Sequence, residues 1–156
     1  MIEIDVPGVG PFALEHLVLD VNGTIAVGGG LIQGVAEAVE ALGAVLHVVA
    51  ITADTHGTAS RLRELLGIDI HVISPGAEGA QKLAFIRELG VQGVVAIGNG
   101  ANDVDMLGEA ALGIAVIGGE GANVAAVIAA DVVTTSVLDA LAMLAQPARI
   151  SAALRR

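Results

Sequence analysis

The 156-residue sequence has no cysteine, no tryptophan and no tyrosine, and it has only two phenylalanines and seven lysine or arginine residues. Without cysteine the chain can form neither disulfide bonds nor a thiolate site, which fits a cytoplasmic protein. Nucleic-acid binding needs clustered cations for the phosphates and aromatic rings for the bases. Because both are scarce and the formal net charge is −10, we do not expect the protein to bind nucleic acid.

Long hydrophobic runs are also missing, although 54% of the residues are hydrophobic and the mean hydropathy is +0.80. The apolar residues occur in short runs, which charged residues or Gly, Asn and Thr interrupt before a bilayer could be spanned. The first residues also lack the basic segment and apolar core of a signal peptide. We therefore expect neither a signal peptide nor a contact with a membrane.

Segments with the pattern of buried strands alternate with segments of helical periodicity along the chain. Strands are predicted at residues 2–6, 16–20, 46–52, 68–73, 94–97, 112–117 and 131–134. Helices are predicted at residues 34–42, 55–66, 78–89, 102–110, 123–129 and 137–144. Strands and helices in this order predict right-handed βαβ units and a largely parallel sheet, which is an α/β fold.

The length of the chain predicts one domain, residues 1–156, with a single substantial core. No internal repeat and no long linker divides the sequence. The core is expected at about residues 14–145, preceded by an edge hairpin in residues 1–13 that turns at Pro7 and Gly8. Residues 146–156 carry no strong pattern and are expected to form a tail.

The predicted strand at residues 16–20 ends in Asp20, and a turn with Asn22 and Gly23 follows directly. Ligands bind at the carboxyl ends of the strands in an open α/β sheet. Asp20 is therefore a candidate metal ligand, nucleophile or both, although an aspartate in this position also commonly serves only to cap the turn. Residues 25–32 predict a small glycine-tipped hairpin beside this strand end.

Further polar residues are predicted at the same edge of the sheet. Thr52 ends the second buried strand, and Lys82, the only lysine, lies near the start of a helix. Asn99 and Asp103 lie in a glycine-containing loop after the strand at residues 94–97. Each feature alone has an ordinary interpretation, as a strand end, a solvated lysine or a strand-to-helix turn. Their order along the chain nevertheless brings four loop positions to one sheet edge.

Residues 20–24 resemble the first motif of the haloacid dehalogenase superfamily, which is Asp-x-Asp-Gly-Thr after an apolar strand. Asn22 takes the place of the second Asp, where P-type ATPases carry a Thr. The looser match is to small soluble hydrolases of this superfamily described as P-type-ATPase-like. The resemblance implies a Rossmann-like three-layer sandwich with a mainly parallel sheet and a flap hairpin after the Asp20 strand. It also implies no cap domain, because the two places of cap insertion have room for little more than one helix each.

The other three motifs of the superfamily have counterparts in the same order. Thr52 matches the Ser or Thr of the second motif, and Lys82 matches the lysine of the third. The fourth motif, Gly-Asp-Gly-x-x-Asp, has Asn99 in place of its first Asp and Asp103 at its second. Asp54, which follows Thr52 closely, is interpreted instead as the cap of the next helix.

The resemblance implies phosphoryl transfer through an aspartyl-phosphate on Asp20, with a small phosphorylated substrate and Mg²⁺ as cofactor. The implied catalytic residues are Asp20, Asn22, Thr52 and Lys82. The implied phosphate-binding residues are Thr52, Ala53, Lys82 and Asn99. The implied metal ligands, direct or through water, are Asp20, the backbone carbonyl of Asn22, Asn99 and Asp103.

Two departures from the family pattern leave alternatives open. Asn22 cannot protonate a leaving group or activate water, and such acid–base help is typically worth ~10²–10⁴-fold. We therefore expect a slow phosphohydrolase or one that acts on an activated phosphate. Asn99 removes a charge from the metal site and should weaken Mg²⁺ binding. The alternatives are a degenerate domain that binds a partner or phosphate without turnover, and a capless sugar-phosphate phosphatase that forms homo-oligomers through its flap.

Overall fold

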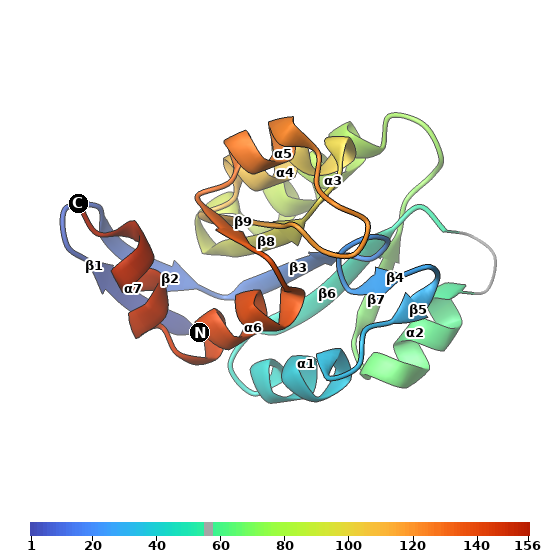
Figure 1. The fold of residues 1–156 in the computed structure, drawn as a ribbon, viewed down its shortest axis with the longest axis horizontal. Helices are drawn as coiled ribbons and strands as arrows, with labels where there is room; N and C mark the ends of the chain where they lie inside the picture. The colour runs from blue at the N-terminus through green and yellow to red at the C-terminus, as the bar shows by residue number, and fades with distance from the viewer. Residues whose placement is uncertain (55–57) are drawn as a thin grey trace.

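A six-stranded parallel sheet forms the centre of the molecule, with the strand order β10-β9-β8-β3-β6-β7 (Figure 1). The computed structural model describes residues 1–54 and 58–156. The sheet consists of β3 (His16–Asp20), β6 (His47–Thr52), β7 (Asp69–Val72), β8 (Val94–Gly98), β9 (Leu112–Val116) and β10 (Val132–Thr134). Each strand lies within one residue of its predicted bounds, and the predicted parallel α/β sheet is confirmed.

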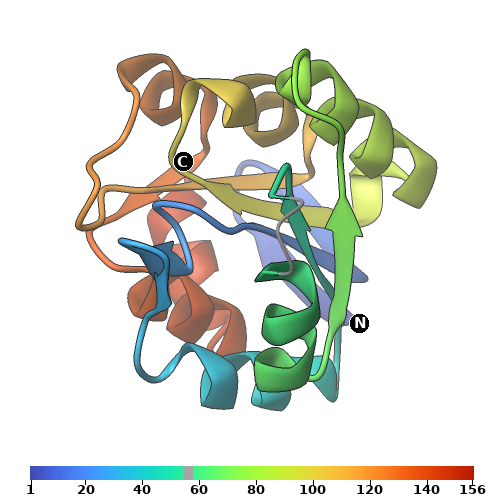
Figure 2. The same cartoon turned by 90° about the vertical axis from the view of Figure 1, so that its right-hand side faces the viewer.

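Helices cover both faces of the sheet and complete the predicted three layers (Figure 2). One face packs against α1 (Val35–Gly43), α2 (Thr58–Leu66) and α6 (Val137–Ala145). The other face packs against α3 (Glu78–Leu89), α4 (Val104–Glu109) and α5 (Val124–Ala129). Along β3, Leu17 and Leu19 belong to the first core and Val18 to the second. Burial on both faces explains why the inner strands are apolar between their ends.

The connections at the carboxyl edge of the sheet are short. The hairpin of β4 (Ala26–Val27) and β5 (Gly30–Leu31) follows β3 and is the predicted flap. Only residues 73–77 separate β7 from α3. The predicted absence of a cap domain is therefore confirmed at both places. The predicted start of the second helix, at residues 55–57, lies outside the described residues.

The two ends of the chain pack together. β1 (Ile2–Val6) and β2 (Gly10–Leu14) form the predicted hairpin, but as a separate two-stranded antiparallel sheet and not as an edge of the central sheet. The predicted tail contains a helix, α7 (Ala148–Leu154), which packs on β1 and buries Ile150. The backbone N–H of Arg156 donates to the carbonyl oxygen of Pro7 at 3.1 Å. At seven residues, α7 is too short for its periodicity to be recognised in the sequence.

No single helix in the described ranges is long and apolar enough to cross a membrane. The helices α6 and α7 meet that test of length and composition only as a pair, which is bent by 109°.

Candidate active site

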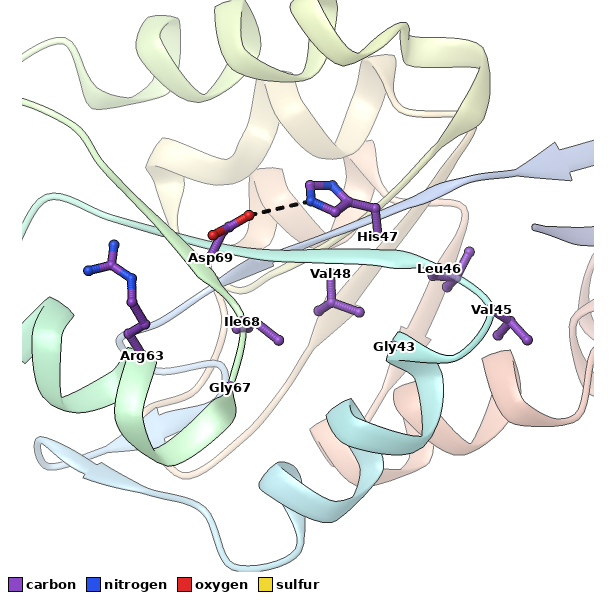
Figure 3. A pocket seen from close by; sticks show the side chains of 9 residues that line it. All are labelled: Gly43, Val45, Leu46, His47, Val48, Arg63, Gly67, Ile68 and Asp69. Atoms are coloured by element: carbon purple, nitrogen blue, oxygen red, sulfur yellow. Dashed lines mark ion pairs between the residues drawn. The ribbon is translucent and has the colours of Figure 1, made fainter.

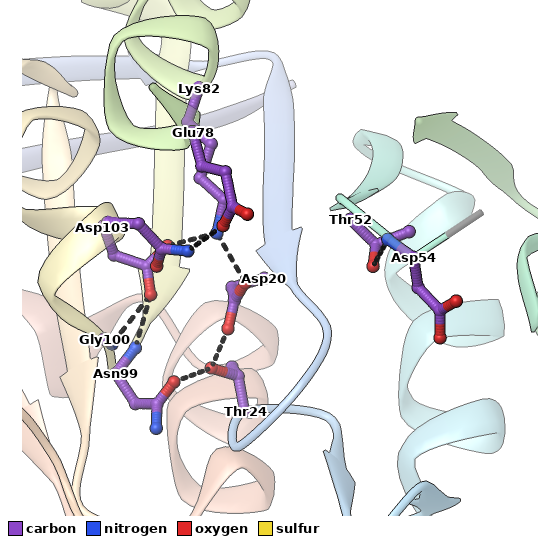
Figure 4. Close-up of polar contacts among 10 residues, drawn as sticks. Asp20, Thr24, Thr52, Asp54, Glu78, Lys82, Asn99, Gly100 and Asp103 are labelled. Atoms are coloured by element: carbon purple, nitrogen blue, oxygen red, sulfur yellow. Dashed lines mark hydrogen bonds and ion pairs between the residues drawn. The ribbon is translucent and has the colours of Figure 1, made fainter. Parts of the chain in front are cut away.

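The polar residues predicted at the carboxyl edge of the sheet meet at one cavity (Figure 4). Asp20 ends β3, Thr52 ends β6 and Asn99 directly follows β8, which are neighbouring strands. The cavity has a volume of about 400 Å³ and is lined by Asp20, Asn22, Thr52, Ala53, Asp54, Glu78, Lys82, Asn99, Gly100 and Asn102. Asp103 is the one predicted site residue outside this lining; it is fully buried and contacts Lys82.

Lys82 joins two aspartates in a buried cluster. Its Nζ donates to Asp20 Oδ1 at 2.6 Å and to Asp103 Oδ1 at 2.7 Å, and the residue is only 1% exposed. The second turn of α3 positions this lysine under the sheet edge, so it is not the solvated helix lysine of the ordinary interpretation. Two carboxylates and one ammonium leave the cluster with one net negative charge.

Burial and neighbouring charge shift the pKa values of this cluster. Burial raises the pKa of Asp20 to about 6, and the charge of Asp103 acts in the same direction. The Lys82 ammonium and the Thr24 hydroxyl oppose this shift. Burial alone would lower the pKa of Lys82, but the two carboxylates outweigh it and raise that pKa above its ordinary value. Lys82 is therefore a fixed positive charge at neutral pH. The carboxyl group of Asp20, by contrast, has its pKa near neutral pH.

Both carboxylate oxygens of Asp103 have protein partners. Oδ1 accepts from Lys82, and Oδ2 accepts the backbone N–H groups of Asn99 at 2.9 Å and Gly100 at 2.8 Å. These bonds hold the loop after β8, which continues into a 3₁₀ turn (Ala101–Asp103) before α4. Asp103 thus positions Lys82 and the loop, and a direct contact with a metal stays a prediction.

Thr24, which is not among the predicted site residues, connects Asp20 with Asn99. Its Oγ1 lies 2.9 Å from Asp20 Oδ2 and 3.2 Å from Asn99 Oδ1. The close approach of Asn99 requires glycine at position 23, where φ is +81° and a Cβ would lie 2.4 Å from Asn99 Nδ2. The Gly-Thr end of the first motif was the available signal for this contact.

The oxygens around Thr24 fit a hard cation such as Mg²⁺. A hydroxyl has one proton, so Thr24 can donate to only one of Asp20 Oδ2 and Asn99 Oδ1 at a time. The other of these two oxygens then receives no proton from Thr24 and could coordinate a cation. Lys82 occupies the other oxygen of Asp20, which leaves Oδ2 as the side open to a metal. Across residues 1–54 and 58–156, no group of three His, Cys, Asp or Glu side chains is placed to hold a metal. A metal here would therefore depend on the amide oxygen of Asn99, a backbone carbonyl and water.

Thr52, Glu78 and Asn102 also line the cavity, and the last two are not among the predicted site residues. Thr52 Oγ1 accepts the N–H of Asp54 at 3.1 Å and can still donate its own proton to a phosphate oxygen. Glu78 Oε2 accepts from Asn102 Nδ2 at 2.7 Å. Glu78 lies four residues before Lys82 on α3, so helical spacing could have indicated it. The predicted capping role of Asp54 depends on residues outside the described ranges.

A larger cavity, of about 690 Å³, lies at the opposite edge of the sheet (Figure 3). Its lining residues lie at the amino ends of β6 and β7 and in the nearby ends of α1 and α2, and they include His47 and Asp69. His47 Nε2 and Asp69 Oδ2 are 3.5 Å apart, and both side chains are more than half exposed. None of the motif residues lies there, so the smaller cavity is the candidate active site.

The fold is a Rossmann-like α/β fold, in which the buried carboxylate of Asp20 ends a central strand at a polar cavity. Within this class, residues 3–111 match the haloacid dehalogenase-like hydrolases. This match covers more than half of the chain, and the chain therefore belongs to that hydrolase family. The family predicted from the two glycine-containing motifs is confirmed, whereas the P-type-ATPase-like subgroup stays a prediction.

One relative and several solved structures are similar to this chain. An uncharacterized protein of Methanocaldococcus jannaschii is 39% identical over 84 residues, which are 51% of this chain and 90% of that protein. The cobalt-bound deoxy-D-mannose-octulosonate 8-phosphate phosphatase of Haemophilus influenzae superposes with a TM-score of 0.71 at 15% identity, covering 88% of this chain and 91% of the other.

The Moraxella catarrhalis 3-deoxy-D-manno-octulosonate 8-phosphate phosphatase, with magnesium, phosphate and KDO, gives a TM-score of 0.69 at 19% identity, over 89% of this chain and 92% of the other. A phospho-aspartyl intermediate analogue of phosphoserine phosphatase gives a TM-score of 0.65 at 14% identity, over 85% of this chain and 99% of the other. At these identities the likeness establishes a shared fold.

Proposed function

We propose that this protein is a Mg²⁺-dependent phosphohydrolase that forms an aspartyl-phosphate on Asp20. The observation that carries the proposal is the buried Asp20 carboxylate, held between Lys82 and Thr24 where the central strand meets a polar cavity. Family membership supports hydrolysis. The magnesium and phosphate in the Moraxella catarrhalis structure and the phospho-aspartyl analogue on a similar fold support the metal and the covalent step.

The chain's own residues have distinct roles in this proposal. An oxygen of Asp20 attacks phosphorus, the bond from phosphorus to the leaving oxygen breaks, and water later hydrolyses the acyl phosphate. Lys82 neutralises negative charge on Asp20 and on the phosphoryl group, and Thr52 donates to a phosphoryl oxygen. Mg²⁺, held by Asp20, Asn99 and the carbonyl of Asn22, would supply further charge neutralisation.

A second candidate is a domain that binds phosphate or a partner without turnover. Asn22 favours it, because an amide cannot give a proton to the leaving group. One assay separates the two candidates: phosphate release from acetyl phosphate and p-nitrophenyl phosphate, with Mg²⁺ or with EDTA. We expect release that needs Mg²⁺ and that falls by about 10³-fold or more in Asp20→Ala. Equal background release by both proteins would favour the binding domain.

Restoring the missing acid is expected to accelerate the enzyme. Asn22→Asp should raise the hydrolysis of an alkyl phosphate ester by about tenfold or more, because the new carboxyl group can protonate the leaving alcohol. Hydrolysis of acetyl phosphate should gain much less, since acetate leaves without a proton. Asn102→Asp is the charge control, because it adds the same charge to the cavity lining without restoring the motif; it also removes the donor to Glu78, so its urea unfolding is measured beside that of the wild type. A folded, Mg²⁺-saturated Asn22→Asp protein with no gain would count against a working Asp20 nucleophile.

A further inference from the structure

The loop of residues 118–123, between β9 and α5, lies outside the four motifs and yet contacts the candidate active site. It makes a tight turn, in which the backbone N–H of Gly121 donates to the carbonyl oxygen of Gly118 at 2.9 Å. At the end of the loop, the N–H of Asn123 donates to the carbonyl oxygen of Asn99 at 2.8 Å. The loop is thus tied to the residue that follows β8.

The same loop also contacts the flap. Glu120 Oε1 accepts the backbone N–H of Gly28, between the two flap strands, at 2.9 Å. An added Cβ at Gly119 would lie 3.2 Å from Val27 Cγ1, so the backbone of the loop packs closely on this flap residue. Contacts on both sides therefore hold the 118–123 loop in place.

The side-chain amide of Asn99 is buried, and its two ends have different partners. Nδ2 donates to the carbonyl oxygen of Gly121 at 3.2 Å. Oδ1 lies 3.2 Å from the hydroxyl of Thr24, which lies 2.9 Å from Asp20 Oδ2 (Figure 4). A carbonyl oxygen can only accept a hydrogen bond, so it keeps the nitrogen of the amide on the side of the loop. The amide oxygen then faces Thr24 and Asp20, where a cation would bind.

The hydrogen bond to Gly121 also bears on the departure of position 99 from the family motif. A carboxylate at this position would place a second acceptor against the Gly121 carbonyl oxygen, and the two oxygens would repel each other. An amide supplies the donor that the carbonyl needs and still presents an oxygen to the cation site. The loop is therefore matched to the asparagine of this chain.

We propose that the backbone carbonyl of Gly121 is a positioning group for the cation site, because it directs the amide oxygen of Asn99 towards the metal that Asp20 also binds. This inference rests on the proposed Mg²⁺-dependent function and adds the 118–123 loop to its site. Gly121 contacts neither the metal nor the substrate and acts only through Asn99. If its carbonyl moves away, the amide of Asn99 is free to rotate, and Mg²⁺ should bind more weakly.

The orientation of the amide can be measured by NMR without metal or substrate. The side-chain NH₂ group of Asn99 should exchange its protons with water about tenfold more slowly than that of Asn123. Asn99 is buried and donates to Gly121, whereas Asn123 is exposed and uses its oxygen to cap α5. Added Mg²⁺ should shift the side-chain resonances of Asn99 and leave those of Asn123 in place. Equal exchange rates of the two amides would overturn the orientation.

Gly121→Ala tests whether the position of the carbonyl matters for the metal. Gly121 has a φ of +74°, which alanine adopts only with strain, although an added Cβ would meet no atom of the described residues within 4 Å. The strained turn should move the carbonyl and raise the Mg²⁺ concentration that gives half of the NMR shift by about tenfold. Gly121→Asn should keep the wild-type value, because asparagine tolerates this backbone conformation.

Gly67→Ala is the matched control. Gly67 has a φ of +65° and equally open surroundings among the described residues, but it follows α2 and lines the cavity at the opposite edge of the sheet. It should lower the urea midpoint of unfolding about as much as Gly121→Ala does, without changing the Mg²⁺ concentration.

The outcomes separate this inference from the proposed function. A wild-type Mg²⁺ concentration for Gly121→Ala would overturn the positioning role and leave the hydrolase standing. A protected Asn99 amide that responds to Mg²⁺, in a wild-type protein that hydrolyses neither acetyl phosphate nor p-nitrophenyl phosphate, would overturn the hydrolase alone. A wild-type spectrum that does not respond to Mg²⁺ would overturn both.

Discussion

Replacing Lys82 with methionine is expected to lower the free energy of unfolding by about 3–5 kcal/mol. Methionine fills a similar volume but leaves the carboxylates of Asp20 and Asp103, both within 2.7 Å of the lost nitrogen, buried without their cation. Urea unfolding at pH 8 and at pH 5 would measure the loss. The defect should shrink at the lower pH, because protonation of carboxyl groups removes their repulsion. Hydrolysis should fall by about 10²-fold or more, since the proposed function assigns Lys82 the charge that stabilises the transition state.

Arg87→Met is the control for Lys82→Met. Arg87 lies on the same helix and also pairs with an acid, Glu109, but both side chains are exposed. Exposed ion pairs contribute little to stability, so this variant should unfold at nearly the urea concentration of the wild type. If Lys82→Met were as stable as Arg87→Met, the cluster would not depend on the lysine charge.

The opposite change in stability is expected for Asp20→Asn, together with a loss of hydrolysis of about 10³-fold or more. Burial raises the pKa of Asp20 from 3.8 to about 6, so folding favours the protonated carboxyl group. The resulting stabilisation of the folded protein is complete below pH 3.8, and it is lost as pH rises through about 6. Asparagine resembles the protonated form at every pH and still accepts a hydrogen bond from Lys82.

The free energy of unfolding of Asp20→Asn should therefore exceed that of the wild type above pH 6, by on the order of 1–3 kcal/mol without Mg²⁺. The difference should disappear toward pH 4. Urea unfolding of both proteins across this range measures it, and added Mg²⁺ should stabilise only the wild type by binding its carboxylate. A less stable Asp20→Asn at pH 8 would mean that the ion pair with Lys82 outweighs the cost of burying the charge.

The parts of the site that follow from strand order were predictable from sequence. Asp20, Thr52 and Asn99 end or follow neighbouring parallel strands, so their common edge needs only the correct βαβ pattern. The bounds of α3, Glu78–Leu89, agree with the prediction, because the glycine after the helix is a common stop signal. Since Lys82 lies near the start of this helix, correct helix bounds also bring it to the sheet edge, close to Asp20 and Asp103.

The parts that depend on side-chain direction were not predictable. The sequence does not show that Asp103 uses one oxygen for Lys82 and the other for two backbone N–H groups. It also does not show that the Thr24 hydroxyl bridges Asp20 and Asn99, which requires knowing how the turn at Gly23 bends. The metal-ligand roles, the division of the chain into core, hairpin and tail, and oligomerisation through the flap stay predictions.

The strand order of the sheet also governs when the active site forms during synthesis. β3 is made early, yet one of its neighbours, β8, pairs His16 with Val94 far along the chain. Asp20 likewise meets Lys82 across 62 positions. A nascent chain that has emerged only as far as α2 therefore has β3 paired on one flank and unprotected on the other. Strands far apart in the sequence pair slowly. Until β8 has been made, the unpaired edge of β3 is therefore the surface that a chaperone would need to shield.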